Sequence, residues 1–174
     1  MWGTVIVGIT NVLATFIAIA FVDRLGRKPI MYAGFVVMGL ALLAVGTLFN
    51  MDIEKNPSLG YPAIGALLVF IIGFAMSAGP IIWVICSEIY PLAGRDLGVT
   101  CSTATNWISN AIVGQTFLTM LTTLGGGNTF LLYGGLNVLF IIFFLIFVPE
   151  TKGISLEQIE RNLMSGLRLR KIGR

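Results

Sequence analysis

Five long apolar runs constrain this chain more than any other feature of its sequence. They lie at about residues 1–22, 29–49, 61–86, 98–123 and 129–148. A helix needs about 20 predominantly apolar residues to cross the hydrocarbon core of a bilayer. Backbone polar groups inside that core must be satisfied within the structure, which a helix achieves by itself. We therefore predict an all-α membrane protein in which residues 1–148 form five transmembrane helices.

The composition agrees with a protein embedded in lipid. Charged residues make up 11% of the 174 residues, whereas a soluble domain carries about 25%. There are 0 His, so the commonest general base and metal ligand is missing. The 2 Cys, Cys86 and Cys101, lie in or beside apolar runs and are expected to be buried structural thiols. We predict no enzyme, no catalytic residue, no cofactor, no metal site and no nucleic-acid partner.

The basic residues predict how the chain is oriented in the membrane. Of the 11 Lys and Arg residues, Lys55 alone falls in the connector between the second and third runs. The other ten fall in the connectors 23–28 and 87–97 and in the tail 149–174. Short loops rich in Lys and Arg remain in the cytoplasm. This pattern predicts a cytoplasmic C-terminus and a periplasmic, or outside, N-terminus.

The tail 149–174 contains a signal for one short helix. Ser155 can cap a helix, and Gln158 follows it three residues later. Leu156, Ile159 and Leu163 then form an apolar stripe. We expect a cytoplasmic amphipathic helix at about residues 155–165, followed by a basic end that is attracted to anionic lipid.

The third apolar run contains a predicted break. Pro80, directly after Gly79, removes a backbone donor, so the helix should bend there. Trp83 follows one turn later, and Glu88 and Arg95 lie where the run leaves the membrane. A broken helix with an aromatic residue and a charged pair is typical of a gated polar path. The same residues also fit a proline-kinked, lipid-facing helix with an ordinary charged loop.

Polar side chains gather on one face of the fourth run. Asn106, Trp107 and Asn110 share that face at helical spacing. Two amides beside an indole form a poor lipid surface but suit a polyol, whose hydroxyls need donors and acceptors. Asn11 gives the first run a similar polar position. The alternative for each is an amide that joins two helices. The second and fifth runs are plain and are expected to be scaffold.

Taken together, these motifs resemble the sugar porter branch of the major facilitator superfamily, a family of twelve-helix transporters. The closer similarity is to bacterial galactose- and arabinose-type sugar–proton symporters. The shared motifs are Asp23-Arg24-x-Gly26-Arg27-Lys28, Gly79-Pro80-x-x-Trp83, Glu88 and Arg95 with Pro91 between them, and Pro149-Glu150-Thr151-Lys152-Gly153. The segments that carry the closer similarity are residues 74–80, 101–107 and 156–161.

The resemblance implies a function and a location for this chain. It aligns with the last five of the twelve helices, so it is expected to be a C-terminal fragment that lacks the N-terminal half. The complete protein would be a symporter of hexose or pentose (galactose, glucose, arabinose or xylose) and protons in the bacterial inner membrane. The fragment alone would transport nothing, since alternating access needs two helix bundles.

The resemblance also implies residue roles, which agree with the polar faces and the charged connectors. The expected sugar contacts are Asn11, Phe74, Trp83, Asn106, Trp107 and Asn110. A cytoplasmic charge network is expected from Asp23, Arg24, Arg27, Glu88, Arg95 and Glu150.

A second hypothesis is a small autonomous membrane protein that acts as a scaffold or regulator by pairing with another helix bundle. The DNA upstream of the Met1 codon would separate the two hypotheses. Seven further encoded spans would favour the transporter fragment, and a clean start at Met1 would favour the autonomous protein. A membrane enzyme is disfavoured, because the sequence offers no nucleophile–base pair or metal-ligand cluster.

Overall fold

The computed structural model describes residues 2–51 and 57–167, which form helices joined by short connections. The α-helices are α1 Trp2–Leu25, α2 Arg27–Asn50, α3 Gly60–Met76, α4 Ala78–Ile89, α5 Arg95–Leu124, α6 Gly126–Phe147 and α7 Leu156–Met164. Two single 3-10 turns, Pro57–Leu59 and Leu92–Gly94, precede α3 and α5.

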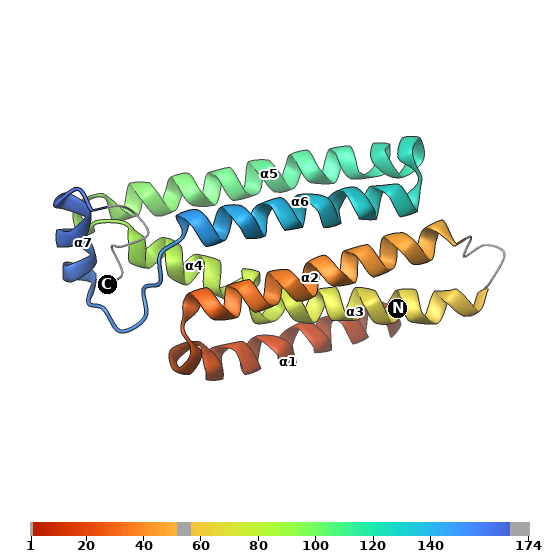
Figure 1. Ribbon diagram of the computed structural model, residues 1–174, viewed down its shortest axis with the longest axis horizontal. Coiled ribbons are helices and arrows are strands. Elements are labelled where there is room, and N and C mark those ends of the chain that lie inside the picture. Colours follow the sequence, from red (N-terminus) through yellow and green to blue (C-terminus); the bar gives the residue numbers. More distant parts are fainter. Residues whose placement is uncertain (1, 52–56, 168–174) are drawn as a thin grey trace.

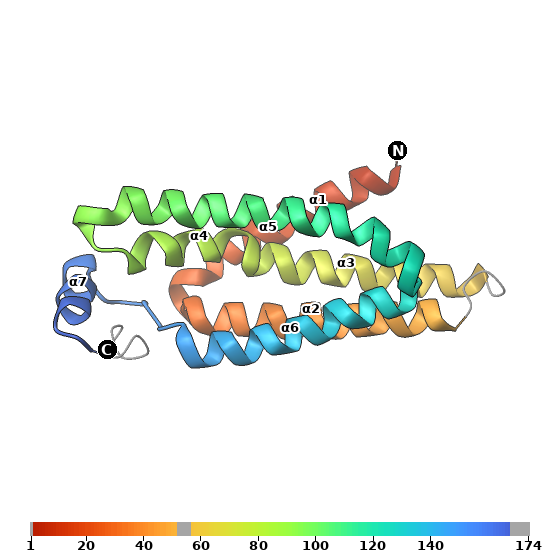
Figure 2. The same ribbon diagram turned by 90° about the horizontal axis from the view of Figure 1, so that it is seen from above.

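The long helices lie side by side in an elongated bundle, and α1 crosses the others at an angle (Figures 1 and 2). The short helix α7 lies beyond one end of the bundle, which we call the α7 end. The turn at Gly26 and the connection from α4 to α5 lie at this end, whereas the turn at Gly125 lies at the opposite end.

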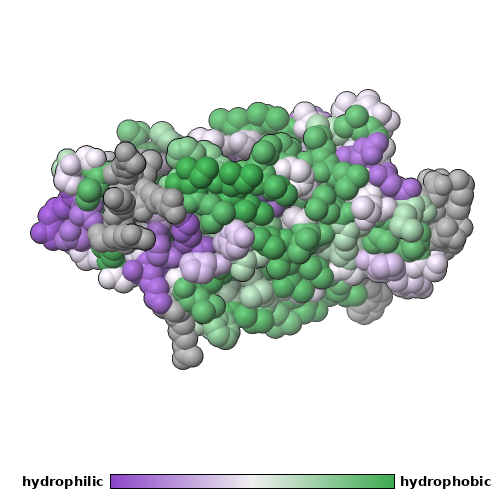
Figure 3. Space-filling model, viewed as in Figure 1, coloured by the Kyte–Doolittle hydropathy of each residue, from purple (hydrophilic) through white to green (hydrophobic). Residues whose placement is uncertain are grey.

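Within the described residues, four helical segments are long and apolar enough to cross a membrane: Gly3–Phe21, Arg27–Asn50, Gly60–Ile89 and Gly126–Phe147. Figure 3 shows the corresponding apolar surface over the middle of one face, with hydrophilic residues gathered at the α7 end. The all-α membrane fold is therefore confirmed. With 30 residues, α5 is long enough to cross, but its polar side chains exclude it from the four, so the count of five spans stays a prediction.

Helix α2, which we expected to be scaffold, lies at the centre of the bundle. It packs most extensively against α6 and α3. Close approach to α6 depends on glycine, because a Cβ on Gly46 would lie 3.0 Å from the carbonyl oxygen of Gly127. Met31 and Val45 are fully buried on α2. The rings of Phe35 and Phe144, whose centroids are 5.6 Å apart, complete the core between α2 and α6.

The third apolar run is interrupted at Ser77, where φ is −132° and ψ is −86°. Helix α3 ends one residue earlier, and α4 begins one residue later. The Ser77 hydroxyl donates a hydrogen bond to the Gly73 carbonyl over 2.6 Å, so this polar side chain is satisfied although it is fully buried.

The interruption thus lies just before Gly79 and Pro80, where the sequence placed the bend. Both residues lie in the first turn of α4. First-turn N–H groups have no partner within their own helix, so proline loses nothing there. The backbone of Ile81 then makes the first bond of the new helix, donating to the Ser77 carbonyl over 3.0 Å.

Helix α7 begins where the cap was expected. The Gln158 backbone N–H donates to the Ser155 hydroxyl over 3.3 Å, whereas the Gln158 side chain turns to Asn162 instead of closing a capping box. Ile159, from the predicted apolar stripe, is buried. Backbone N–H donation and the Ser155 hydroxyl hold the pKa of Glu157 below its usual value, and the positive charges of Arg161 and Arg95 act in the same direction.

Candidate functional site

A polar hollow of about 380 Å³ lies between α4 and α5. Trp83, Cys86 and Tyr90 line it from α4, together with Ile82. Helix α5 contributes Cys101, Ser102, Thr105 and Asn106. The hollow thus combines one indole face with hydroxyl and amide groups, which is the chemistry that a polyol requires.

Two contacts near the α7 end hold α4 and α5 together beside this hollow. The hydroxyl groups of Tyr90 and Ser102 form a hydrogen bond of 2.7 Å. The Tyr90 ring also covers Gly98, since a Cβ on Gly98 would lie 2.6 Å from it. A glycine one turn before Ser102 is therefore what permits the aromatic ring to fit between the two helices.

The polar face of α5 is open. Asn106, Trp107 and Asn110 are all exposed, and no residue of α5 is buried within the described chain. The side-chain amides of Asn106 and Asn110 form no hydrogen bond to any described residue, whereas Thr103 and Thr105 bond to carbonyls of their own helix. The two amides are therefore available to an external ligand or to another helix.

The structure does not place all six expected sugar contacts together. Trp83 and Asn106 line the same hollow. Phe74 lies on α3 just before the interruption, and a Cβ on Gly79 would lie 3.5 Å from its ring. Asn11 borders a separate, smaller hollow along α1, and its backbone and side-chain oxygens both accept from Thr15.

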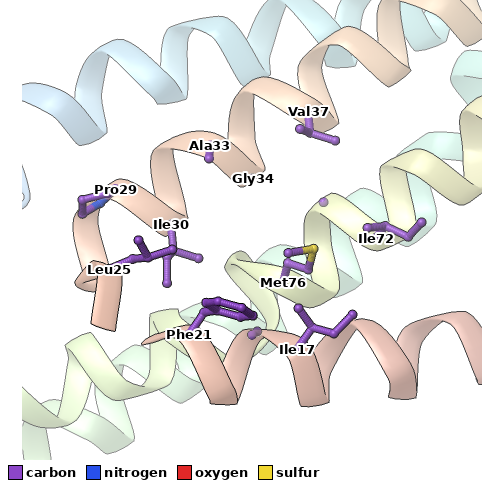
Figure 4. A pocket seen from close by; sticks show the side chains of 12 residues that line it. Ile17, Phe21, Leu25, Pro29, Ile30, Ala33, Gly34, Val37, Ile72 and Met76 are labelled. Atoms are coloured by element: carbon purple, nitrogen blue, oxygen red, sulfur yellow. The ribbon is translucent and has the colours of Figure 1, made fainter. Parts of the chain in front are cut away.

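A larger hollow of about 450 Å³ lies among α1, α2 and α3, but its walls are apolar. In Figure 4, Ile17 and Phe21 of α1 face Ile30 of α2 and Met76 of α3 across this space. Such walls offer no partner for the hydroxyls of a sugar, because a polar group buried without a hydrogen bond is costly. The polar hollow between α4 and α5 is therefore the candidate binding site.

At the α7 end, Glu88 connects three parts of the chain. One of its carboxylate oxygens accepts from the Arg27 guanidinium over 3.2 Å, and the two side chains are only 17% and 18% exposed. The other oxygen accepts from the Thr151 hydroxyl, and Thr151 is buried. The sequence did not indicate Thr151. Glu88 thus joins α4 to the start of α2 and to the tail.

Glu150 caps the first turn of α2. Its carboxylate accepts from the backbone N–H groups of Arg27 over 3.1 Å and Lys28 over 2.9 Å. A carboxylate at a helix N-terminus satisfies free donors and complements the helix dipole. Gly26 makes this possible, because it adopts φ +96° and its missing Cβ would lie 3.0 Å from the Glu150 carboxylate.

Lys28 provides the reciprocal contact at the end of α6. Its ammonium group donates to the carbonyls of Leu145 over 3.1 Å and Val148 over 2.7 Å. These carbonyls lie at the C-terminal end of α6, where backbone carbonyls have no hydrogen-bond partner within the helix. The start of α2 is therefore joined to the tail by the Glu150 carboxylate, to the end of α6 by the Lys28 ammonium group, and to α4 by the Arg27–Glu88 pair.

The remaining expected network members are placed differently. Arg95 begins α5 and forms no ion pair within the described residues, and its Nε is buried without a hydrogen-bond partner. Its positive charge makes the smallest of the contributions that lower the pKa of Glu157 on α7. Asp23 and Arg24 lie in the last turn of α1, and their side chains are outside what the structure describes.

Comparisons with known proteins show that this chain is similar to sugar transporters. A family model described as "Sugar (and other) transporter" matches residues 1–163. The galactose-proton symporter of Escherichia coli (strain K12) is 66% identical over 173 residues, which is 99% of this chain and 37% of that protein. The arabinose-proton symporter of the same strain is 49% identical over 175 residues, again 99% of this chain and 37% of that protein.

Among solved structures, the xylose transporter of Escherichia coli in an inward-open conformation matches with a TM-score of 0.84 and 36% identity. The match covers 94% of this chain and 36% of the transporter. The chain therefore spans little more than a third of the length of the transporters that it matches.

Proposed function

Since the chain belongs to the sugar transporter family of the major facilitator superfamily, we propose that it forms the C-terminal, sugar-contacting part of a sugar–proton symporter. The family consists of transporters rather than enzymes. The single observation that carries the proposal is the hollow between α4 and α5, where Trp83 and Asn106 meet. Next to it, α5 leaves Asn110 and Trp107 open to whatever completes the site.

The proposed substrate is a monosaccharide such as galactose, glucose, arabinose or xylose. A pyranose ring offers hydroxyls to the free amides of Asn106 and Asn110 and a C–H face to the Trp83 indole. The names of the similar galactose- and arabinose-proton symporters support this class of substrate. Phe74, Trp107 and Asn11 are proposed to join the site when a second helix bundle closes it.

The proton-coupling group is proposed to lie in that second bundle. In the described part of this chain, the acidic residues fall at the ends of the long helices or in the tail, at Asp23, Glu88, Asp96, Glu150, Glu157 and Glu160. None of these positions offers a carboxylate at the middle of a span to accept a transported proton. The 174 residues alone are therefore expected to move no sugar.

The α7 end is proposed to be the cytoplasmic gate. Here the Arg27–Glu88 ion pair links α2 to α4, and Glu150 of the tail accepts a hydrogen bond from the Arg27 backbone at the start of α2. We propose that Asp23, Arg24 and Arg95 extend this network and that it holds the cytoplasmic side closed in the outward-open state. The uneven distribution of Lys and Arg supports a cytoplasmic tail and a periplasmic N-terminus in a bacterial inner membrane.

A chimera tests the sugar contacts. The chain replaces its matching segment in the galactose-proton symporter of Escherichia coli, and Trp83→Ala or Asn106→Ala is introduced there. Each loses an aromatic or hydrogen-bonding contact worth about 1–3 kcal/mol, so the kcat/KM of galactose uptake should fall roughly tenfold or more.

Asn128→Ala is the matched control for these variants. Asn128 lies near the start of α6 at the opposite end, where its amide bonds to the Leu124 carbonyl. Its replacement should leave uptake kinetics close to those of the parent chimera. Unchanged kinetics for both Trp83→Ala and Asn106→Ala would refute the assignment of this hollow to sugar.

A further inference from the structure

The chain's 2 cysteines line the same hollow. Cys86 projects from α4 and is half-buried, whereas Cys101 projects from α5 and is exposed. Both are free thiols. The expectation that both are buried structural thiols is therefore wrong, since both line an accessible hollow.

The two thiols line the hollow from opposite helices, close to a contact that joins α4 to α5. Cys86 lies one turn before Tyr90, so both occupy one face of α4. Cys101 directly precedes Ser102, the residue whose hydroxyl is bonded to Tyr90 over 2.7 Å. The contact between α4 and α5 thus lies within about one helical turn of each cysteine along the chain. The two thiols reach one space from two facing elements.

From this geometry we propose that Cys86 and Cys101 form a two-thiol site for a single soft, thiophilic metal ion. Binding replaces two S–H bonds by two metal–sulfur bonds and releases two protons, so no oxidant or reductant is required. Thiolates select soft metal ions, whereas Mg²⁺ and Ca²⁺ require several oxygen ligands including carboxylates. The hollow offers no carboxylate among its lining residues.

A metal ion held by both sulfurs would cross-link α4 to α5 at the hollow that we assign to sugar. This inference goes beyond transport, because the site needs only these two helices and can be measured by binding alone. It does not depend on the identity of the substrate. Its failure would leave the sugar site untouched, and failure of the sugar assignment would leave the thiol geometry unchanged.

The test uses the full chain, purified in detergent, with Hg²⁺ as the probe and a chromogenic disulfide reagent that counts free thiols. One Hg²⁺ per chain should remove both thiols from reaction. Methylmercury, which has a single coordination position for sulfur, should require two equivalents per chain. The chain should remain a monomer during the Hg²⁺ titration, as measured by its mass.

The single variants Cys86→Ser and Cys101→Ser provide the matched comparison. Each keeps one thiol, so Hg²⁺ should be removed by a competing monothiol at a concentration roughly 100-fold or more below that needed for the parent chain, since the second sulfur acts at high effective concentration. Three results would overturn the proposal: two Hg²⁺ ions per parent chain, one Hg²⁺ bridging two chains with a doubled mass, or equal retention by parent and variants.

If a serine variant fails to fold, the parent chain alone still tests whether both sulfurs bind one metal ion. The ratio of Hg²⁺ to methylmercury at full thiol protection should be one to two. Equal amounts of the two reagents would show that each sulfur binds its own metal ion and would contradict the shared site.

Discussion

Replacing Glu88 by alanine should destabilise the protein by about 2–4 kcal/mol, since the guanidinium of Arg27, which has little exposure, loses the Glu88 carboxylate as an acceptor. The same change leaves the buried Thr151 hydroxyl without its acceptor. For a protein of this size, the temperature of half-unfolding should fall by roughly 5–15 °C. Heating the detergent-purified protein and measuring the remaining monomer by size exclusion checks this value.

Glu160→Ala is the control for the effect of losing one negative charge at the α7 end. The Glu160 carboxylate makes a long contact of 3.5 Å with the Leu92 backbone N–H, so its removal should cost about 0.5 kcal/mol or less. If Glu88→Ala and Glu160→Ala shift the unfolding temperature equally, the linking role of Glu88 is wrong.

Alanine at Gly34 should also destabilise the protein strongly, although alanine is the better helix former. A Cβ there would lie 1.9 Å from the Ser77 hydroxyl oxygen and 2.9 Å from the Gly73 carbonyl oxygen. Helix α2 would have to move away from the α3–α4 interruption, at a cost of about 2–4 kcal/mol. The same thermal measurement should show a fall of roughly 5–15 °C.

Gly65 on α3 is the matched glycine, since an added Cβ there meets nothing within 4 Å. Gly65→Ala should be neutral or stabilising by up to about 1 kcal/mol, through helix propensity alone. Adding Ser77→Gly to Gly34→Ala should recover part of the loss, because the closest clash disappears. A fall of the same size for both single alanine variants would contradict the predicted role of Gly34.

Periodicity and hydropathy were sufficient to predict where the long helices lie, but not how they pack. The second run gave no indication of its packing role, because glycine has no side chain that would mark a contact in the sequence. In the structure, Gly34 and Gly46 are the points where α2 touches its neighbours. The interruption lies at Ser77 rather than at Pro80, since proline is tolerated in a first helical turn and the buried serine sits against Gly34.

The candidate site shows the same limit: the sequence indicates which residues share a helix face but not which helices approach each other. Helical spacing was enough to place Asn106, Trp107 and Asn110 on one open face of α5. It could not show that Trp83 shares a hollow with Asn106, because that depends on how α4 approaches α5. At the α7 end, charge spacing suggested a partner for Glu88 but did not indicate the Thr151 hydroxyl. Charge spacing also placed Arg95 in this network, but the structure shows no ion pair between Arg95 and another described residue, and its Nε is buried without a hydrogen-bond partner.

Sugar-driven proton uptake into membrane vesicles tests the central claim most directly. Vesicles that carry the chimera with the galactose-proton symporter should show galactose-dependent alkalinisation of the medium. Vesicles that carry only the 174 residues should match empty vesicles with galactose, glucose, xylose and arabinose, because we propose that a second helix bundle supplies one wall of the site and the proton acceptor. Sugar-dependent alkalinisation by this chain alone would contradict the account and indicate a transporter assembled from copies of the chain.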